Sequence, residues 1–426
     1  MKELLIILNE WWETHTISEE KAKKYRRKIF KNIKDTFFSY KQILVLTGLR
    51  RVGKTTIFYQ LIQELLKRGV NPKNILYFTF DEMVENPINV LKEYSRITKI
   101  DWRREKIFIF FDEIHKLENW SSKIKILYDN LPNLKICISG SASIMIESEA
   151  IKNLAGRYFL FEIKPLTLQE FGELYFERKI DNYELFEDKL KMIFEDYIRK
   201  PFPEIVKWKD RIKINQYIRE LVIEKIVKSE IPLIFKNINI SLLSTLTEIF
   251  MKDVGTILDI TSLSKDLGIH KLTLIKHLKI LEFGKIIKTV KNFRPSIRSE
   301  SRKLKKIYPT NISLSLCFYP NLSKGQIYEN LVLTALNLDK YWRKNRREID
   351  FLKINKEITP IEVKEKNRIK KHDLKNLTWF MKKYGVNKGI IIYDGEENTI
   401  NINNKKILLY PILKTLFKFK IQNKKY

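Results

Sequence analysis

Residues 48–56 combine two glycines with a lysine and a threonine at a spacing that suits phosphate binding. Their order, Gly-Leu-Arg-Arg-Val-Gly-Lys-Thr-Thr, fits the pattern G-x-x-x-x-G-K-[ST]. The glycines of such a loop let successive backbone N–H groups turn toward phosphate oxygens. Lys54 can reach the β and γ phosphates of ATP or GTP, and the hydroxyl of Thr55 can ligate magnesium at the start of a helix. The predicted nucleotide-binding residues are Gly48, Leu49, Arg50, Arg51, Val52, Gly53, Lys54, Thr55 and Thr56.

A second stretch could supply the carboxylates of a nucleotide hydrolase. Five apolar residues, 107–111, are followed by Asp112 and Glu113, about 60 residues after the glycine-rich loop. An acid at the end of a buried strand can hold magnesium, usually through water, and the next acid can polarise the attacking water. We predict Asp112 as a metal ligand, together with Thr55, and Glu113 as the catalytic base.

The surrounding sequence has the pattern of a parallel sheet that positions these residues. A segment of helical periodicity, 55–68, follows the glycine-rich loop and ends at Gly69, a frequent residue after a helix. Apolar runs without alternation indicate strands that are buried on both faces, as in parallel sheets covered by helices. Strands are predicted at 42–46, 74–80, 107–113 and 134–139.

Two further residues could respond to charge on the γ-phosphate. Ser139 ends the fourth predicted strand, beside the expected γ-phosphate, and Ser141 follows it. The tripeptide Ser-Gly-Ser is equally typical of an ordinary turn, so both interpretations stay open. Arg157 lies in a short loop before the next strand. It could stabilise transition-state charge in the same chain or in a neighbouring subunit, or it could be a surface arginine.

These motifs resemble the AAA-like ATPases, a prokaryotic family that is abundant in archaea and related to the AAA+ and STAND NTPases. The resemblance implies that the nucleotide is ATP rather than GTP and that a helical lid, 165–240, packs over it. Lys200-Pro201 departs from the glycine pair that many relatives have at this place. The stretches that carry the resemblance are 9–12 (Asn-Glu-Trp-Trp), 47–56, 110–115 (Phe-Phe-Asp-Glu-Ile-His), 138–142, 155–158, 164–171 and 201–204.

Residues 241–310 have the pattern of a winged helix-turn-helix. Helices are predicted at 241–252, 261–267 and 270–283, the third with Leu272 among its apolar residues and with Lys271, Lys276 and Lys279 exposed. The following wing has nine basic residues and a single acid, Glu300. A wing of this kind suits DNA phosphates, although the same module can dock protein. The basic residues are Lys285, Lys288, Lys291, Arg294, Arg298, Arg302, Lys303, Lys305 and Lys306.

The C-terminal segment has carboxylates and a lysine at the spacing of a magnesium-dependent nuclease. Strands predicted at 349–353 and 360–364 would form an antiparallel hairpin with Glu362 and Lys364 on one face. Carboxylates at these positions can hold a metal that activates water, and the lysine can steady developing charge. The pattern resembles the PD-(D/E)XK nucleases, and whether the region cuts DNA or only binds it stays open. The predicted metal ligands are Glu329, Asp350 and Glu362, and the predicted catalytic residues are Asp350, Glu362 and Lys364.

The overall charge favours a polyanionic partner. The chain of 426 residues has 81 Lys and Arg against 51 Asp and Glu, a net charge of +30. Nucleic acid is a better match than a membrane surface, although evenly solvated charge is the alternative. Clustering in the wing and in a later run favours DNA; self-association or a protein partner also stays open. The later run is Lys366, Arg368, Lys370, Lys371 and Lys375.

Cysteine content and hydropathy indicate a cytoplasmic protein that is not bound to a membrane. Cys137 and Cys317 lie far apart within apolar runs, which favours neither a disulfide framework nor a zinc site. No apolar run approaches the roughly 20 residues of a membrane span. The predicted domains are an N-terminal helical segment (1–40), an α/β P-loop ATPase core (41–164), a helical lid (165–240), a winged helix (241–310) and an α/β endonuclease-like domain (311–426).

Overall fold

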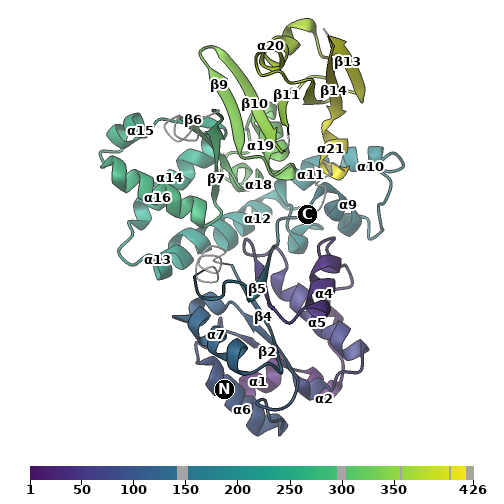
Figure 1. Ribbon diagram of the computed structural model, residues 1–426, viewed down its shortest axis with the longest axis vertical. Coiled ribbons are helices and arrows are strands. Elements are labelled where there is room, and N and C mark those ends of the chain that lie inside the picture. Colours follow the sequence, from purple (N-terminus) through teal and green to yellow (C-terminus); the bar gives the residue numbers. More distant parts are fainter. Residues whose placement is uncertain (142–151, 295–303, 356, 403, 419–426) are drawn as a thin grey trace. The chain divides into compact units, whose positions relative to one another are not determined.

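The computed structural model describes residues 1–141, 152–294, 304–355, 357–402 and 404–418. The chain divides into two compact units, Met1–Pro165 and Leu166–Tyr426 (Figure 1). Each unit has its own sheet, with five described strands in the first and nine in the second. The two units are described separately below.

The first unit has a five-stranded parallel sheet in the order β2-β3-β4-β1-β5. Every residue of β1 to β4 is buried, as the uninterrupted apolar runs predict. Helix α5 (Lys54–Lys67) covers one face, and α6 (Pro87–Thr98) and α7 (Trp120–Asn130) cover the other (Figure 1). The predicted parallel α/β sheet is therefore confirmed. Its strands are β1 (Ile43–Thr47), β2 (Ile75–Thr79), β3 (Ile107–Asp112), β4 (Leu134–Gly140) and β5 (Tyr158–Glu162).

The N-terminal residues close the free edge of β2. The Asn9 side chain donates to the Tyr77 carbonyl at 2.9 Å and accepts from the Tyr77 N–H at 2.7 Å, as a neighbouring strand would. The indole N–H groups of Trp11 and Trp12 both donate to the carbonyl of Ile75, at 3.1 and 2.8 Å. An unpaired strand edge invites association with other chains, so these bonds account for the Asn-Glu-Trp-Trp stretch. The helices here are α1 (Lys2–Leu8), α2 (Trp11–Thr14), α3 (Glu19–Ala22) and α4 (Phe30–Ser39).

The second unit begins with a helical region. Its first helix is capped by a reciprocal pair of bonds between Thr167 and Glu170, which satisfies backbone donors at the helix start. The helices are α9 (Leu168–Tyr175), α10 (Glu187–Met192), α11 (Phe194–Arg199), α12 (Arg211–Gln216), the π-type helix η4 (Tyr217–Glu230) and α13 (Ile231–Ile234).

The middle segment alternates helices and strands. Gly268, with φ of +63°, turns the chain between α15 and α16, and β8 pairs antiparallel with both β6 and β7. Lys271, Lys276 and Lys279 are exposed on α16 as expected. Leu272 is not part of its apolar face, because its side chain lies 80% exposed at the start of the helix. The elements are α14 (Ile240–Lys252), β6 (Thr256–Leu258), α15 (Ile260–Asp266), α16 (Lys271–Phe283), β7 (Ile287–Asn292) and β8 (Lys305–Pro309).

The C-terminal elements extend the same sheet. Strand β7 pairs parallel with β9 through Lys291 and Asn292, so the full order is β13-β14-β12-β11-β10-β9-β7-β8-β6. A shared core joins the two segments, with Val290 and Tyr308 packed in one cluster with Phe351 and Ile361. The remaining elements are α18 (Ser313–Leu316), α19 (Lys324–Ala335), β9 (Lys340–Lys344), β10 (Arg347–Ile354), β11 (Ile358–Val363), α20 (Lys375–Lys383), β12 (Lys388–Tyr393), β13 (Asn398–Ile402), β14 (Lys405–Pro411) and α21 (Ile412–Lys418).

Candidate functional site

The glycine-rich loop joins the end of β1 to the start of α5, and its backbone conformation depends on glycine. Gly48 has φ of +141°, and a Cβ at this position would lie 2.1 Å from the carbonyl oxygen of Ile163. Gly53 has φ of +95° and directly precedes Lys54, the first residue of α5. The loop therefore curls at the N-terminus of a helix, where free N–H groups and the helix dipole favour an anion.

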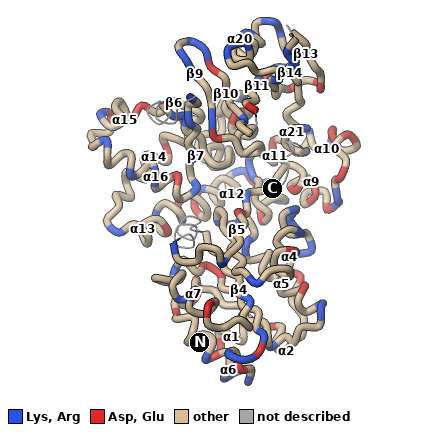
Figure 2. Tube along the Cα trace, viewed as in Figure 1, with Lys and Arg blue, Asp and Glu red and all other residues tan. Residues whose placement is uncertain are grey.

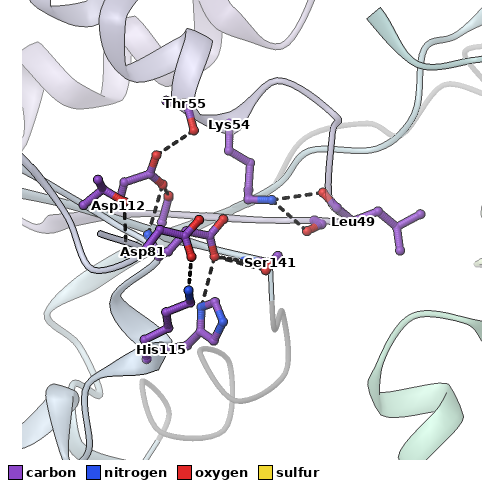
Figure 3. A network of polar contacts seen from close by, with 12 residues as sticks. Leu49, Lys54, Thr55, Asp81, Asp112, His115 and Ser141 are labelled. Atoms are coloured by element: carbon purple, nitrogen blue, oxygen red, sulfur yellow. Dashed lines mark hydrogen bonds and ion pairs between the residues drawn. The ribbon is translucent and has the colours of Figure 1, made fainter. Parts of the chain in front are cut away.

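Lys54 binds the loop itself in this structure. Its ammonium donates to the carbonyl oxygens of Gly48 and Leu49, at 3.1 and 3.0 Å (Figure 3). The residue is only 5% exposed, so the cation is held inside the curl of the loop. Neutral carbonyls are weaker partners for an ammonium than phosphate oxygens, so an incoming phosphate can displace them. The predicted role of Lys54 requires only this exchange of partners.

Asp112 lies at the centre of a polar cluster at the end of β3. The hydroxyl of Thr55 donates to one carboxylate oxygen at 2.6 Å, and that of Ser139 donates to the other (Figure 3). Burial raises the pKa of Asp112, with a further contribution from Glu113, while Ser139, Thr55 and Lys54 act in the opposite direction. Mg²⁺ prefers hydroxyl and carboxylate oxygens as ligands, so the residues present fit this metal. The fold thus brings Thr55, Asp112 and Ser139 together.

Glu113 is held beside this cluster by β4. It has φ of +51°, and its carboxylate accepts from the N–H and the hydroxyl of Ser141, both at 3.0 Å. His115 Nδ1 lies 3.2 Å from the same carboxylate. Burial alone would raise the pKa of Glu113, but Lys54, His115, the Ser141 N–H and Arg50 lower it to about 2. Glu113 is therefore ionised, and it is bonded to Ser141, one of the two serines predicted to respond to the γ-phosphate.

Arg157 lies near the start of β1, whereas the glycine-rich loop follows the end of that strand. Its carbonyl accepts from the N–H of Ile43, the first residue of β1, whereas the loop follows the last residue of that strand. The two ends of this five-residue strand are about 13 Å apart. The Arg157 guanidinium is instead paired with Asp129, with Nε at 2.7 Å from the carboxylate. In this arrangement the partner of Arg157 is therefore Asp129, and its predicted role toward the nucleotide stays a prediction.

Sequence reasoning missed three residues of this site. Tyr77 on β2 donates its hydroxyl to Asp112 at 3.0 Å, a contact that depends on β2 and β3 being neighbours. His115 is 6% exposed, and it directly follows the Asp-Glu-Ile stretch, which could have signalled it. Arg27 donates to the carbonyls of Val52 and Lys164, both at 2.9 Å, and so ties the loop to the end of the unit. No local pattern identifies Arg27.

The second unit brings together the four residues predicted for the nuclease-like site. Glu329 is on α19, Asp350 on β10, and Glu362 and Lys364 on and beside β11. Strands β10 and β11 pair antiparallel, as predicted, with Phe351 opposite Ile361, and Asp350 accepts from the N–H of Val363 at 2.8 Å. Lys364 lies 2.6 Å from the Glu362 carboxylate.

These carboxylates influence one another strongly. Burial, and then Asp350, raise the pKa of Glu329 to about 7, against the effect of Lys306 and the Tyr308 hydroxyl. Burial and Asp350 also raise the pKa of Glu362, against Lys364. Within the described parts of the chain, no group of three or more His, Cys, Asp or Glu has an arrangement that could hold a metal ion.

Lys306 belongs to this acidic cluster rather than to a DNA-facing wing. Its ammonium lies 2.5 Å from Glu348 and 3.9 Å from Glu329, and its side chain is 7% exposed. The predicted place of Lys306 among the phosphate-contacting residues of the wing is wrong, because on β8 this side chain is buried against acids. Three further residues of the predicted wing, Arg298, Arg302 and Lys303, lie outside the described residues.

A basic cavity of about 1070 Å³ opens where β7 meets the β9–β10 hairpin. The hairpin has mainly Lys and Arg at its tip, as Figure 2 shows. The wall includes two tyrosines, and no Asp or Glu is among its described residues. Arg294 and Lys383 are held there, Arg294 by the carbonyl of Arg343 at 2.6 Å and Lys383 over the ring of Trp379 at 4.8 Å. The lining residues are Ile257, Asn292, Arg294, Leu304, Tyr341, Arg343, Lys344, Asn345, Lys383 and Tyr384.

Comparison with known proteins identifies the first unit as an AAA-type domain. Residues 40–172 match a family model described as an AAA domain. The segments 192–323 and 324–413 each match a model described only as a domain of unknown function. The chain therefore has an ATPase-like domain of the AAA type, followed by two regions whose families have no assigned function. None of the described helices has the length and apolar character that crossing a membrane requires.

Three uncharacterised proteins are similar in sequence. One from Methanocaldococcus jannaschii is 30% identical over 50% of this chain and 46% of its own length. One from Haemophilus influenzae is 27% identical over 58% of this chain and 61% of its own length. A second M. jannaschii protein is 29% identical over 86% of both chains. The matched region thus spans about half of the first relative.

Two solved structures align with part of this chain at low TM-scores. The Walker-type ATPase of Pyrococcus abyssi gives a TM-score of 0.41 at 14% identity, covering 69% of this chain and 95% of its own. The ORC2 protein of Aeropyrum pernix in its ADP form gives 0.36 at 10% identity, covering 69% and 90%. TM-scores of this size carry no argument about details of the site.

Proposed function

We propose that this protein binds and hydrolyses ATP with Mg²⁺ and uses the nucleotide to control contacts of its second unit with DNA. The observation that carries the proposal is the cluster at the end of β1, β3 and β4. There, a curled glycine-rich loop with Lys54 adjoins Asp112, and Asp112 is bonded to Thr55 and Ser139. A phosphate-binding loop beside a metal-binding carboxylate is what hydrolysis of a nucleoside triphosphate requires.

Each residue has a defined part in this mechanism. Lys54 leaves the carbonyls of Gly48 and Leu49 and binds phosphate oxygens, while Thr55 and Asp112 would hold the metal. Bound Mg²⁺ supplies charge neutralisation at the β and γ phosphates. Ser139, bonded to Asp112, is positioned to respond to a ligand there.

Glu113 must change partners before it can orient the attacking water. Its carboxylate is bonded to Ser141 and close to His115, so hydrolysis requires release of these contacts. A carboxylate whose pKa is about 2 is a weak base and acts by polarising and aligning water. The site thus has two states, with the Glu113 carboxylate bonded either to Ser141 or to water. A change between these states can alter the conformation of other parts of the protein.

The ATPase proposal is tested by Mg²⁺-dependent phosphate release from full-length protein. Asp112→Asn should lower the turnover at least about 100-fold, because the metal loses a charged ligand. Asp129→Asn is the matched control, since Asp129 pairs with Arg157 at the end of the strands opposite to the glycine-rich loop. Equal turnover of the wild type and Asp112→Asn would refute the assignment of the site.

The basic cavity supports the DNA part of the proposal. Four cations and two tyrosines suit the phosphates and bases of a nucleic acid. The order α14, β6, α15, α16, β7, β8 supports the winged-helix interpretation. Changing both Lys344 and Lys383 to Glu should weaken DNA binding and reduce the salt dependence by about two counterions. Lys388→Glu, an exposed lysine on β12, is the control. Fluorescence anisotropy across a salt series measures both, and unchanged slopes would favour protein docking instead.

A nuclease-like role for the C-terminal region is a second candidate. The juxtaposition of Asp350, Glu362 and Lys364 favours it, as does Glu329 on the adjoining helix. Incubation of linear, nicked and single-stranded DNA with Mg²⁺ or Mn²⁺ tests it, with Asp350→Ala as the negative control. Cleavage that Asp350→Ala removes would support nuclease activity; DNA binding without cleavage would leave the region a binding module.

A further inference from the structure

The cations that line the basic cavity have few acidic partners. Arg343 is 3.6 Å from the carboxylate of Glu348, and Arg294 donates to a neutral carbonyl, that of Arg343, at 2.6 Å. Among the residues that the structure describes, Arg294, Lys344 and Lys383 form no ion pair with an acid. Their charge is therefore available to an anion, and the hollow shape of the site concentrates the positive potential.

Hydrogen bonds between different elements fix the wall of this cavity. Asn292, the last residue of β7, accepts from the N–H of Arg343 at 3.1 Å and donates to its carbonyl at 3.2 Å. The Tyr341 hydroxyl donates to the carbonyl of Leu304 at 2.8 Å, and the Tyr384 hydroxyl accepts from an indole N–H at 2.9 Å. A wall that is held in this way loses little conformational freedom when a ligand binds, which favours affinity.

The size and shape of the cavity favour a single strand of DNA over a duplex. A sphere of 1070 Å³ is about 13 Å across, close to the width of one groove of duplex DNA, so a whole duplex cannot enter. A duplex is read by elements that project into its grooves, whereas a single strand lies in a basic groove and stacks its bases on aromatic side chains. The described lining, with four cations, two tyrosines and no acid, matches the second kind of site.

We propose that the basic cavity is a binding site for single-stranded DNA, with Lys344 and Lys383 on its phosphates and the half-buried Tyr384 beside a base. The proposal rests on the DNA part of the proposed function and states which form of DNA the second unit contacts. Unpaired bases present their faces to an aromatic ring, and stacking of this kind tolerates any sequence. An unpaired end or an opened stretch of a longer DNA is therefore the expected ligand.

Fluorescence anisotropy of the full-length protein with labelled oligothymidine of about 16 nucleotides tests the proposal. The wild type should bind this strand at least about tenfold more tightly than the same strand in a blunt duplex with oligoadenosine. Asn345→Asp should weaken binding of the single strand about fivefold, because it adds a negative charge of the same shape to the cavity wall. The matched control is Asn404→Asp, since Asn404 also has a positive φ, +59°, and lies between β13 and β14, outside the described lining.

The possible results separate this proposal from the proposed function. A preference for the single strand that Asn345→Asp reduces and Asn404→Asp leaves intact supports the cavity as the site. If the blunt duplex binds as tightly as the single strand and Asn345→Asp weakens both, the hairpin contacts duplex DNA; the proposed function then stands and the single-strand site is refuted. Equal affinities of the two variants for the single strand would place its binding elsewhere and also overturn the proposal. Absence of binding to every form of DNA would refute both.

Discussion

The two units each place lysine beside carboxylates, but they do so in opposite ways. In the first unit the described hydrogen bonds of Lys54 go to two backbone carbonyls, 3.1 and 3.0 Å away, next to the Asp112 cluster. In the second unit Lys306 and Lys364 are bound directly to acids, at 2.5 and 2.6 Å. A lysine on neutral partners can exchange them for phosphate, whereas a lysine on carboxylates neutralises them. The first site is thus prepared for a ligand, and the second is balanced by the protein itself.

Removing Lys54 should give the largest effect, because it tests whether the first cluster is prepared for an anion. Lys54→Ala should lower ATP affinity and turnover at least about 100-fold, since the Lys54 ammonium is the group held inside the curl of the loop. Lys67→Ala, at the exposed end of α5, is the control. Binding of a fluorescent ATP analogue, together with phosphate release, measures the effect. Wild-type affinity in Lys54→Ala would remove the contrast between the units.

Glu113→Gln should separate ATP binding from hydrolysis. The amide keeps the shape of the side chain but cannot polarise water, so turnover should fall about 100-fold while ATP affinity is kept. His115→Gln should change turnover less, because His115 contacts Glu113 and not the predicted position of the phosphate. Steady-state kinetics with a binding isotherm distinguish the two effects. A parallel loss of ATP affinity in Glu113→Gln would assign the residue to binding.

The acidic cluster of the second unit should make stability depend on pH. The pKa of Glu329 is raised to about 7 from an ordinary 4.5, so the folded state holds the proton more tightly than the unfolded state. Stability from this group is complete below about pH 4.5 and is lost as the pH rises through 7. Glu329→Gln cannot lose this proton. Its unfolding temperature relative to wild type should therefore rise by roughly 2–4 °C between pH 5 and pH 8, in EDTA. A difference independent of pH would contradict the burial effect on Glu329.

Arg157→Ala should have the smallest effect in the isolated chain. Its guanidinium is paired with Asp129 at the end of the strands opposite to the glycine-rich loop. Turnover at low protein concentration should therefore stay within about twofold of the wild-type value. A loss of turnover only at high concentration would indicate a role in a neighbouring subunit. A large loss at every concentration would contradict the strand arrangement.

Local motifs made the core of the first site predictable. The glycine-rich loop, Lys54, Thr55 and Asp112 follow from the strand–loop–helix and strand-end patterns, because each depends on a few neighbouring residues. The antiparallel pairing of β10 with β11 was predictable in the same way, because the two strands are separated by only a short turn. Tyr77 was missed because its contact with Asp112 depends on which strands are adjacent.

Long-range pairing set the limits of prediction for charged residues. Arg157 lies two residues after Ala155 in a plausible loop, and the parallel register of β5 with β1 places it beside the first residue of β1, at the end of the strand opposite to the glycine-rich loop. Lys306 looks like any wing lysine in the sequence, and its contact with Glu348 depends on the pairing of β8 with β7 and of β7 with β9. Periodicity assigns a face within one strand, but it does not say what that face meets.

Counting the Mn²⁺ ions bound by full-length protein, with and without a non-hydrolysable ATP analogue, tests the contrast between the units most directly. Electron paramagnetic resonance of free Mn²⁺ gives the count. We predict no tightly bound Mn²⁺ without the analogue, because no group of acidic residues in the described parts of the chain has an arrangement that could hold a metal ion. With the analogue we predict one equivalent, at Thr55 and Asp112. Tight binding of Mn²⁺ without nucleotide, or none with it, would contradict this account.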